Sequence, residues 1–190
     1  FSPISQASAS TDYNAYGSQI QWGRYSDGHE LINWTSSTAT DGAEQANKTS
    51  TASPTTTVGH DDFIFRNAAP YAWYSGTSPD PDTLWQGEAG INNPCPQGYR
   101  VPTQAEWNVE RLTWATNDRS GALASPLKLT VSGRRGYFDA FFQNIGTNAY
   151  YWSSTPNPSD NSTSLYISSS NASTGLYTRA YGMPVRCIKD

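Results

Sequence analysis

Residues 92–107 read Asn-Asn-Pro-Cys-Pro-Gln-Gly-Tyr-Arg-Val-Pro-Thr-Gln-Ala-Glu-Trp, and they contain the clearest helix start in the chain. Thr103 precedes a run of helix-forming residues, and Glu106 follows three positions later. A threonine at this place can accept a hydrogen bond from the backbone of the glutamate, whose side chain bonds back to the threonine N–H. The spacing therefore predicts a helix that begins just after Thr103.

Apolar side chains recur on two sides of this predicted helix. Ala105, Val109 and Leu112 share one stripe at helical spacing. Trp107 and Trp114 lie seven residues apart on roughly the opposite side. Because a helix that is apolar on two sides needs cover on both, we expect it to lie between a sheet and a second layer.

Alternating apolar and polar segments predict strands before and after the helix. The predicted strands are residues 19–24, 127–131, 149–154, 164–168, 176–179 and 184–188. Turn-rich spacers separate the later ones, which predicts an antiparallel meander with long loops. Residues 26–59 are mostly Ser, Thr, Asp, Asn and Gly and predict a long surface excursion. We expect one α+β domain over residues 1–190, with residues 1–18 as a lead-in, mixed or antiparallel sheets and one or two helices.

The composition replaces aliphatic side chains with aromatic ones. The 190 residues include 7 Trp, 12 Tyr and 6 Phe, against only 22 Leu, Ile, Val and Met together. Large rings bury enough area to build a core. A net charge of −4 without basic clusters argues against binding to nucleic acid. No apolar run is long enough to span a bilayer, so membrane insertion is not expected.

Cys95 and Cys187 are the only cysteines. A disulfide between them would stabilise the fold by on the order of 4 kcal/mol in the loop-entropy model, and it would persist in an oxidising compartment. The alternative is a pair of reduced, buried thiols. His29 and His60 stand at spacings that give no zinc signature, so we expect them to be ordinary loop residues.

Several short motifs together resemble the Fibrobacter succinogenes major paralogous domain. They are residues 92–107, the Tyr-Tyr-Trp-Ser-Ser run at 150–154 and the ending at 179–190, which contains Pro-Val-Arg-Cys. Residues 21–24 and 84–87 fit the family as well. The motifs follow in the family's order over almost the whole chain, so the resemblance is more specific than any single motif.

The resemblance implies an extracellular bacterial domain with a C-type-lectin-like fold, in which Cys95 pairs with Cys187. It implies that the motif tryptophans are scaffold; these are Trp22, Trp85, Trp107 and Trp152. Such domains also resemble ligand-binding modules of large calcium-dependent RTX adhesins, with peptide ends and glycans as targets. The chain departs from the family at Arg134, where an aromatic residue is usual, and over residues 137–142, so specificity is expected there.

Acidic side chains in loops are candidates for a calcium site, because Ca²⁺ prefers oxygen ligands. The candidates are Asp80, Asp82, Asp118, Asp139 and Asp160. No twelve-residue calcium loop is present, and Asp also favours turns by bonding to its own backbone. Each candidate is therefore either a turn residue or a metal ligand, and the resemblance favours at least one bound Ca²⁺.

The region from residue 133 to 151 is the expected ligand surface. Its two arginines offer planar forks that match carboxylates, and the aromatic residues beside them can anchor a ligand. The alternative is that two or three of the rings at Tyr137, Phe138, Phe141 and Phe142 fill the core under a long loop. The predicted ligand-binding residues are Arg134, Arg135, Tyr137, Phe138, Asp139, Asp160 and Asn161.

These features predict the ligand-binding domain of a bacterial surface adhesin that mediates cell adhesion by binding peptides or proteins. A C-terminal carboxylate would be held by an arginine or by calcium. The alternatives are a calcium-dependent lectin and a structural surface module without a small ligand. Catalysis is not expected, since no Ser nucleophile elbow, Ser-His-Asp set or phosphate loop is visible. The start at Phe1 leads us to expect one monomeric module of a longer, secreted chain.

Overall fold

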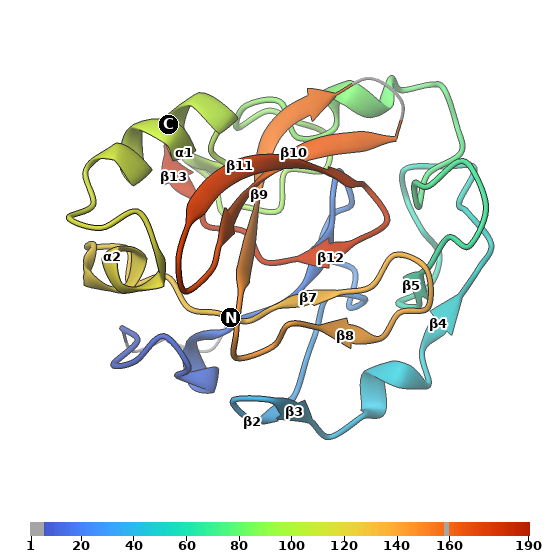
Figure 1. The fold of residues 1–190 in the computed structure, drawn as a ribbon. Coiled ribbons are helices and arrows are strands. Elements are labelled where there is room, and N and C mark those ends of the chain that lie inside the picture. The colour runs from blue at the N-terminus through green and yellow to red at the C-terminus, as the bar shows by residue number, and fades with distance from the viewer. Residues whose placement is uncertain (1–5, 158–159) are drawn as a thin grey trace.

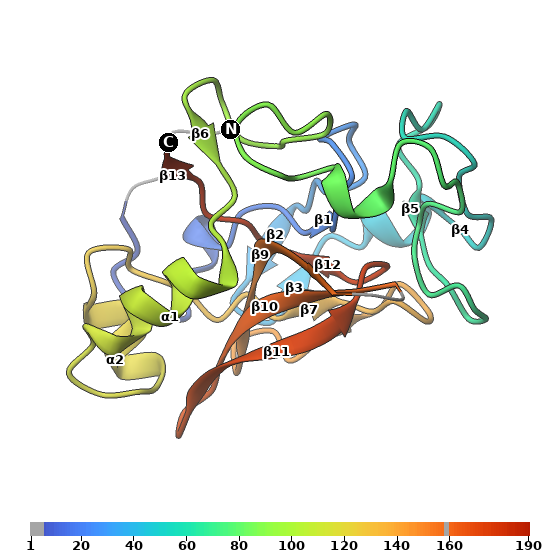
Figure 2. The same ribbon diagram turned by 90° about the horizontal axis from the view of Figure 1, so that it is seen from above.

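The computed structural model describes residues 6–157 and 160–190, and its architecture is α+β with mostly antiparallel sheets (Figures 1 and 2). Within these residues the helices are α1 (Gln104–Leu112) and α2 (Arg119–Ala124), with 3-10 turns η1 (Tyr13–Ala15), η2 (Ala43–Gln45) and η3 (Pro81–Thr83). The first strands are β1 (Ile20–Gln21), β2 (Trp34–Ser36), β3 (Ala39–Thr40), β4 (Lys48–Thr49), β5 (Phe63–Ile64) and β6 (Tyr99–Arg100). The later strands are β7 (Arg134–Arg135), β8 (Phe142–Gln143), β9 (Ala149–Asn157), β10 (Asn161–Ile167), β11 (Ala172–Thr178), β12 (Gly182–Met183) and β13 (Ile188–Lys189).

Strands β9, β10 and β11 form an antiparallel meander in the place of the strands predicted over 149–154, 164–168 and 176–179, with β11 beginning earlier, at Ala172. The strand predicted over 184–188 is wrong, because only Ile188 of that range lies in a strand. Leu165 in β10 lies opposite Tyr151 in β9 and Thr174 in β11, and the register shifts between Ser162 and Ser164. Helix α1 packs against this sheet (Figure 2). The long strands of the second half thus form one wall of the core.

A four-stranded sheet in the order β1–β12–β7–β8 joins the early and late parts of the chain. Ile20 pairs with Met183, and Gly182 pairs with Arg135. Because consecutive strand residues point to opposite faces, the side chains of Arg134 and Arg135 leave β7 in opposite directions. This sheet therefore separates the environments of the two candidate arginines.

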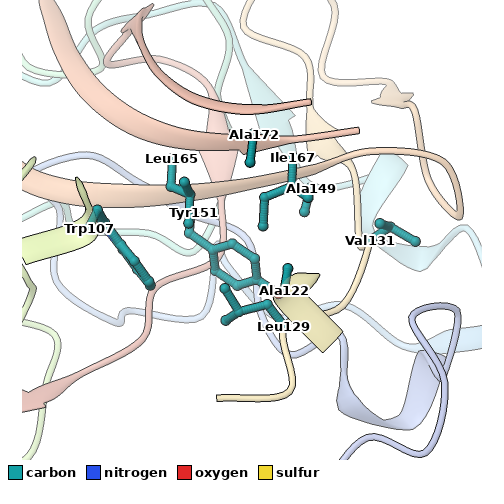
Figure 3. Close-up of a cluster of buried hydrophobic side chains, with 9 residues drawn as sticks. All are labelled: Trp107, Ala122, Leu129, Val131, Ala149, Tyr151, Leu165, Ile167 and Ala172. Atoms are coloured by element: carbon teal, nitrogen blue, oxygen red, sulfur yellow. The ribbon is translucent and has the colours of Figure 1, made fainter. Parts of the chain in front are cut away.

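The largest core cluster lies between the meander and the two helices (Figure 3). Trp107 of α1 and Ala122 of α2 belong to it together with Tyr151 and Leu165 of the sheet. The Tyr151 hydroxyl donates to the Thr130 carbonyl at 2.8 Å and accepts from the Thr130 N–H at 2.9 Å. The polar end of the ring is thus satisfied inside the core.

Buried tryptophans connect segments that are distant in sequence. Trp22, Trp85 and Trp152 are fully buried. The indole N–H of Trp22 donates to the Ser153 carbonyl at 2.7 Å, and that of Trp152 donates to the Ile20 carbonyl at 2.9 Å. Each ring buries a large apolar area while its N–H finds a partner, so these tryptophans are scaffold, as predicted.

Helix α1 begins as predicted but packs differently. The Thr103 hydroxyl accepts from the Glu106 N–H at 3.2 Å, and the Glu106 carboxylate accepts from the Thr103 N–H at 2.7 Å, which confirms the capping box. The expected cover on both sides is wrong, because Val109 and Leu112 are 66% and 76% exposed. Only the side that carries Trp107 contacts the sheet, since this indole donates to a β9 carbonyl at 3.1 Å.

The strand predicted over residues 127–131 is wrong. Lys128 has a left-handed φ of 50°, and the Thr130 N–H bonds to a tyrosine hydroxyl instead of a neighbouring strand. The Val131 N–H donates to the Ser10 carbonyl at 2.8 Å. The alternating pattern arises because Leu129 and Val131 enter the core from an extended segment without a sheet partner.

Both ends of the chain are attached to the rest of the fold. The Cys95–Cys187 disulfide joins the segment before α1 to the last residues. Tyr16 lies in the segment expected as a lead-in. It is 2% exposed and donates its hydroxyl hydrogen to the Ser37 carbonyl at 3.1 Å. Residues 1–5 of that segment lie outside the described residues.

No described helix combines the length and the apolar character needed to cross a membrane.

Candidate functional site

The two neighbouring arginines of β7 lie in opposite environments. Arg135 is 1% exposed, and its guanidinium lies 4.1 Å from the centre of the Phe63 ring. It donates to the carbonyls of Ala140 at 3.2 Å, His29 at 3.4 Å and Glu44. The structure thus places Arg135 in the scaffold, where it holds three loop carbonyls together.

Arg134 is half-buried and stacks among tyrosine rings. Its guanidinium carbon lies 4.1 Å from the ring centre of Tyr181, 4.6 Å from that of Tyr150 and 5.3 Å from that of Tyr177. Its Nε donates to the Gln143 side-chain oxygen at 3.0 Å. Among the described residues its two terminal nitrogens have no hydrogen-bond partner and form no ion pair, so a fixed, planar fork remains open.

We call the surroundings of this arginine the tyrosine face; it comprises Arg134 with Tyr71, Tyr137 and Tyr177, which are at least partly exposed, and with Tyr150 and Tyr181, which are buried beneath them. The Tyr137 ring lies 4.7 Å from Tyr181 and 5.8 Å from Tyr71 between centres. Burial raises the pKa of Tyr177 to about 12, and it also raises that of Tyr181. These phenols therefore stay protonated and uncharged at neutral pH, which is compatible with an anionic ligand.

The aromatic segment after β7 divides between surface and packing. Phe138 is 54% exposed and lies 6.3 Å from the Tyr137 ring, at the margin of the tyrosine face. Phe141 is also exposed, with the Lys48 ammonium 4.6 Å from its ring centre. Phe142 packs on Trp34 at 5.5 Å. Of the predicted ligand-contacting rings, Tyr137 packs on Tyr181, which stacks on Arg134, whereas Phe138 contacts only Tyr137 among the aromatic rings of the described residues.

Three of the predicted calcium ligands meet around one pocket of about 430 Å³, which we call the carboxylate hollow. Its wall includes Trp22, Trp73, Asp80, Asp82, Asp160 and Arg179. The turn η3 supplies the first two aspartates, and the start of β10 brings the third, which is remote in sequence. The structure thus places the three aspartates around one pocket, although their carboxylate oxygens do not all lie within 4.8 Å of one another.

Each carboxylate of the hollow has a different set of bonds. Asp80 accepts from the Asp82 N–H at 2.9 Å, as the cap of η3. Asp82 forms an ion pair with the buried Arg179, whose Nε donates to the Asn161 carbonyl at 3.1 Å. Asp160 accepts from the Tyr71 N–H at 3.1 Å. This last bond joins the hollow directly to the tyrosine face.

Asp118 and Asp139 lie outside the hollow. Asp118 caps α2 by accepting from the Ser120 N–H at 2.8 Å and the Gly121 N–H at 3.1 Å, and the Gly121 bond is the main cause that lowers its pKa. Asp139 accepts from the Phe141 N–H at 3.0 Å. Their bonds are those of turn residues, and metal binding at either position stays a prediction.

The structure also contains a cluster of two carboxylates and one histidine that was not predicted from the sequence. Within the described part of the chain, Asp27, His29 and Glu30 are the one set of three such side chains whose ligand atoms lie within 4.8 Å of one another, so they could hold a metal ion. The prediction that His29 is an ordinary loop residue is wrong, because it is only 2% exposed. The run Asp-Gly-His-Glu at residues 27–30 brings these three side chains close together in sequence and could have indicated the cluster.

Hydrogen bonds already occupy both nitrogens of His29. Its Nδ1 lies 2.5 Å from the Asp27 carboxylate, and its Nε2 accepts from the Gln21 N–H at 3.1 Å. Burial lowers the pKa of His29 to about 4, although Asp27 opposes this shift. A metal ion would have to displace one of these bonds, so the arrangement favours a neutral histidine in a buried network that also includes Arg24.

Comparison with known proteins gives no family for this chain. No family model matches the sequence, and no curated protein or solved structure matches it. The lectin-like fold and the family resemblance therefore stay predictions, and a functional proposal has to rest on the described side chains.

Proposed function

We propose that this chain is an extracellular ligand-binding domain of a bacterial surface adhesin, with a C-type-lectin-like fold, that binds the C-terminal end of a peptide or protein. The observation that carries the proposal is Arg134, a half-exposed guanidinium held among three tyrosine rings with its terminal nitrogens open. Because the side chain is already fixed, little conformational entropy is lost when a ligand binds.

A terminal carboxylate is the ligand group that fits this fork best. Two parallel N–H donors on a planar guanidinium match the two oxygens of a carboxylate. Apolar ligand side chains would lie on Tyr137 and Phe138, which remain partly exposed; Tyr137 reaches the arginine's surroundings through its contact with Tyr181, and Phe138 packs on Tyr137. Aromatic and arginine side chains together are typical anchors of binding surfaces.

The carboxylate hollow is the proposed calcium position. Asp80 and Asp160 offer hard oxygen donors and form no ion pair among the described residues, whereas the charge of Asp82 is offset by Arg179. Calcium takes such carboxylate and carbonyl oxygens. A bound ion would fix the Asp160 loop, which bonds to the backbone of Tyr71, and would thereby hold the adjoining tyrosine face in shape.

The extracellular location rests on the disulfide between Cys95 and Cys187, because such bonds persist in oxidising compartments. Adhesion follows from the proposed ligand, since a module that holds exposed peptide ends can attach one cell surface to another. Binding rather than catalysis is proposed, because the open groups of the face are an arginine and uncharged phenols, which anchor a ligand without supplying a nucleophile.

The test is a peptide library with free C-termini, screened beside the same library with amidated C-termini. Hits are then measured by calorimetry on the wild type, on Arg134→Gln and on Arg111→Gln, a control arginine on α1. We expect amidation and Arg134→Gln each to weaken binding roughly tenfold or more, as loss of a charged hydrogen bond implies. Equal affinity for acid and amide, or a glycan array hit without peptide binding, would contradict the proposal.

A second measurement addresses calcium alone. Melting and peptide binding are compared with Ca²⁺ and with EDTA, for the wild type and for Asp160→Asn. We expect calcium to raise the melting temperature of the wild type and to act less on the variant. If EDTA changes neither property, the calcium part of the proposal fails while the arginine part stands.

A further inference from the structure

A second pocket opens on the opposite side of β7 from the tyrosine face. It has a volume of about 350 Å³, and Arg135 forms part of its wall. The loop at residues 28–33, residues 41–47 around the turn η2, and Asp61 supply the rest. This pocket, which we call the acidic pocket, takes no part in the function proposed above.

Three carboxylates line the acidic pocket: those of Asp41, Glu44 and Asp61. Within residues 6–157 and 160–190 none of them forms an ion pair. Arg135, the guanidinium in the same wall, donates to backbone carbonyls and attracts Glu44 electrostatically without an ion-pair contact, so it offsets one of the three negative charges. The pocket therefore carries net negative charge, which attracts a cation.

Glu44 points to a ligand that donates hydrogen bonds. The residue is 8% exposed, and its Oε1 accepts from the Thr40 hydroxyl at 2.6 Å. Its Oε2 is buried and has no hydrogen-bond partner among the described residues. Leaving a buried carboxylate oxygen unpaired costs free energy, and Glu44 lines the pocket, so an added N–H donor for this carboxylate would be favoured.

We propose that the acidic pocket binds a primary alkylammonium group, such as a lysine side chain or a small amine. An ammonium group on an alkyl chain can bond to Glu44 while its chain lies along Leu31 and Ile32, which also line the pocket. The exposed carboxylate of Asp61 adds attraction at the entrance.

The test is an NMR titration of the intact domain with three probes. They are Nα-acetyl-lysine methylamide, its Nε-acetylated form as an uncharged control, and n-butylammonium. The proteins are the wild type, Glu44→Gln and Asp12→Asn, a matched carboxylate substitution outside the pocket. We expect saturable shifts at amides of Gly28, Ala43 and Asn47 with the lysine probe, weakened roughly tenfold or more in Glu44→Gln and unchanged in Asp12→Asn.

The probes also separate the two sources of the ammonium group. Tighter binding of the lysine probe than of n-butylammonium supports a peptide lysine, and the reverse supports a small amine. Equal shifts with the acetylated probe, no saturable shift, or full affinity in Glu44→Gln would each overturn the proposal. Should Glu44→Gln fail to fold, substitution of the exposed Asp61 by Asn serves as the second variant. Asp61→Asn must then lower the affinity for the lysine probe about twofold or more. Arg134→Gln leaves this site unaffected, so the outcome is independent of the tyrosine face.

Discussion

Replacing each arginine of β7 by methionine should separate scaffold from surface. Arg135→Met keeps the apolar stem on Phe63 but removes the donors for the carbonyls of Ala140, His29 and Glu44. At about 2 kcal/mol for each buried acceptor left unpaired, the loss is about 6 kcal/mol. This loss is partly offset, because the substitution also removes the free-energy cost of burying a charged guanidinium. Burial lowers the pKa of Arg135 from its usual value to about 10, a cost of about 3 kcal/mol for the charged form.

The expected net effect of Arg135→Met is therefore a loss of about 3 kcal/mol in the free energy of unfolding. Arg134→Met loses one part-buried hydrogen bond and the contacts with the tyrosine rings, together worth about 1 kcal/mol. Urea unfolding followed by tryptophan fluorescence, with the disulfide intact, measures both. Equal losses for the two variants, or a larger loss for Arg134→Met, would refute the assignment of the two side chains.

Three further predictions concern stability. His29 has a folded pKa of about 4, below its unfolded value of 6.5, so the unfolded state binds more protons between these values. Stability should accordingly fall by about 3 kcal/mol as the pH drops from 6.5 to 4, and urea titrations should find a smaller fall in His29→Gln. Thr103→Ala removes the cap hydrogen bond of α1 and should lower the free energy of unfolding by about 1 kcal/mol. Thr113→Ala, at the other end of the helix, is the control in the same assay and should lower it less. Replacing Cys95 and Cys187 by serine should cost about 4 kcal/mol, and an unchanged thermal midpoint would contradict this.

Helix capping and strand alternation depend on residues close together in sequence, so part of the fold could be predicted from the sequence. The Thr103–Glu106 capping box depends on residues three positions apart and was predicted correctly. The meander depends on strand patterns separated by turns, and its three strands β9, β10 and β11 were predicted, whereas the strand expected over 184–188 is wrong. The segment 127–131 satisfied the same alternation but is bonded to a tyrosine hydroxyl and to Ser10. Such partners lie far away in sequence, and periodicity carries no information about them.

The sequence was enough to name several residues of the candidate site, but it did not show how their side chains are arranged in space. The arginine pair and the aspartates could be named, because fork-shaped and oxygen-rich side chains stand out in a chain with few charges. Which arginine faces the tyrosines depends on the side of β7 from which each side chain leaves. The meeting of Asp82 with Asp160, and the burial of His29 beside Asp27, are consequences of long-range packing.

The most direct measurement of the central proposal is a crystal structure of the domain with a free-acid peptide from the library, grown in calcium. The account predicts that the terminal carboxylate lies within hydrogen-bond distance of the Arg134 terminal nitrogens, with the peptide side chains on Tyr137 and Phe138. A peptide bound elsewhere, with the nitrogens of Arg134 still unoccupied, would contradict it.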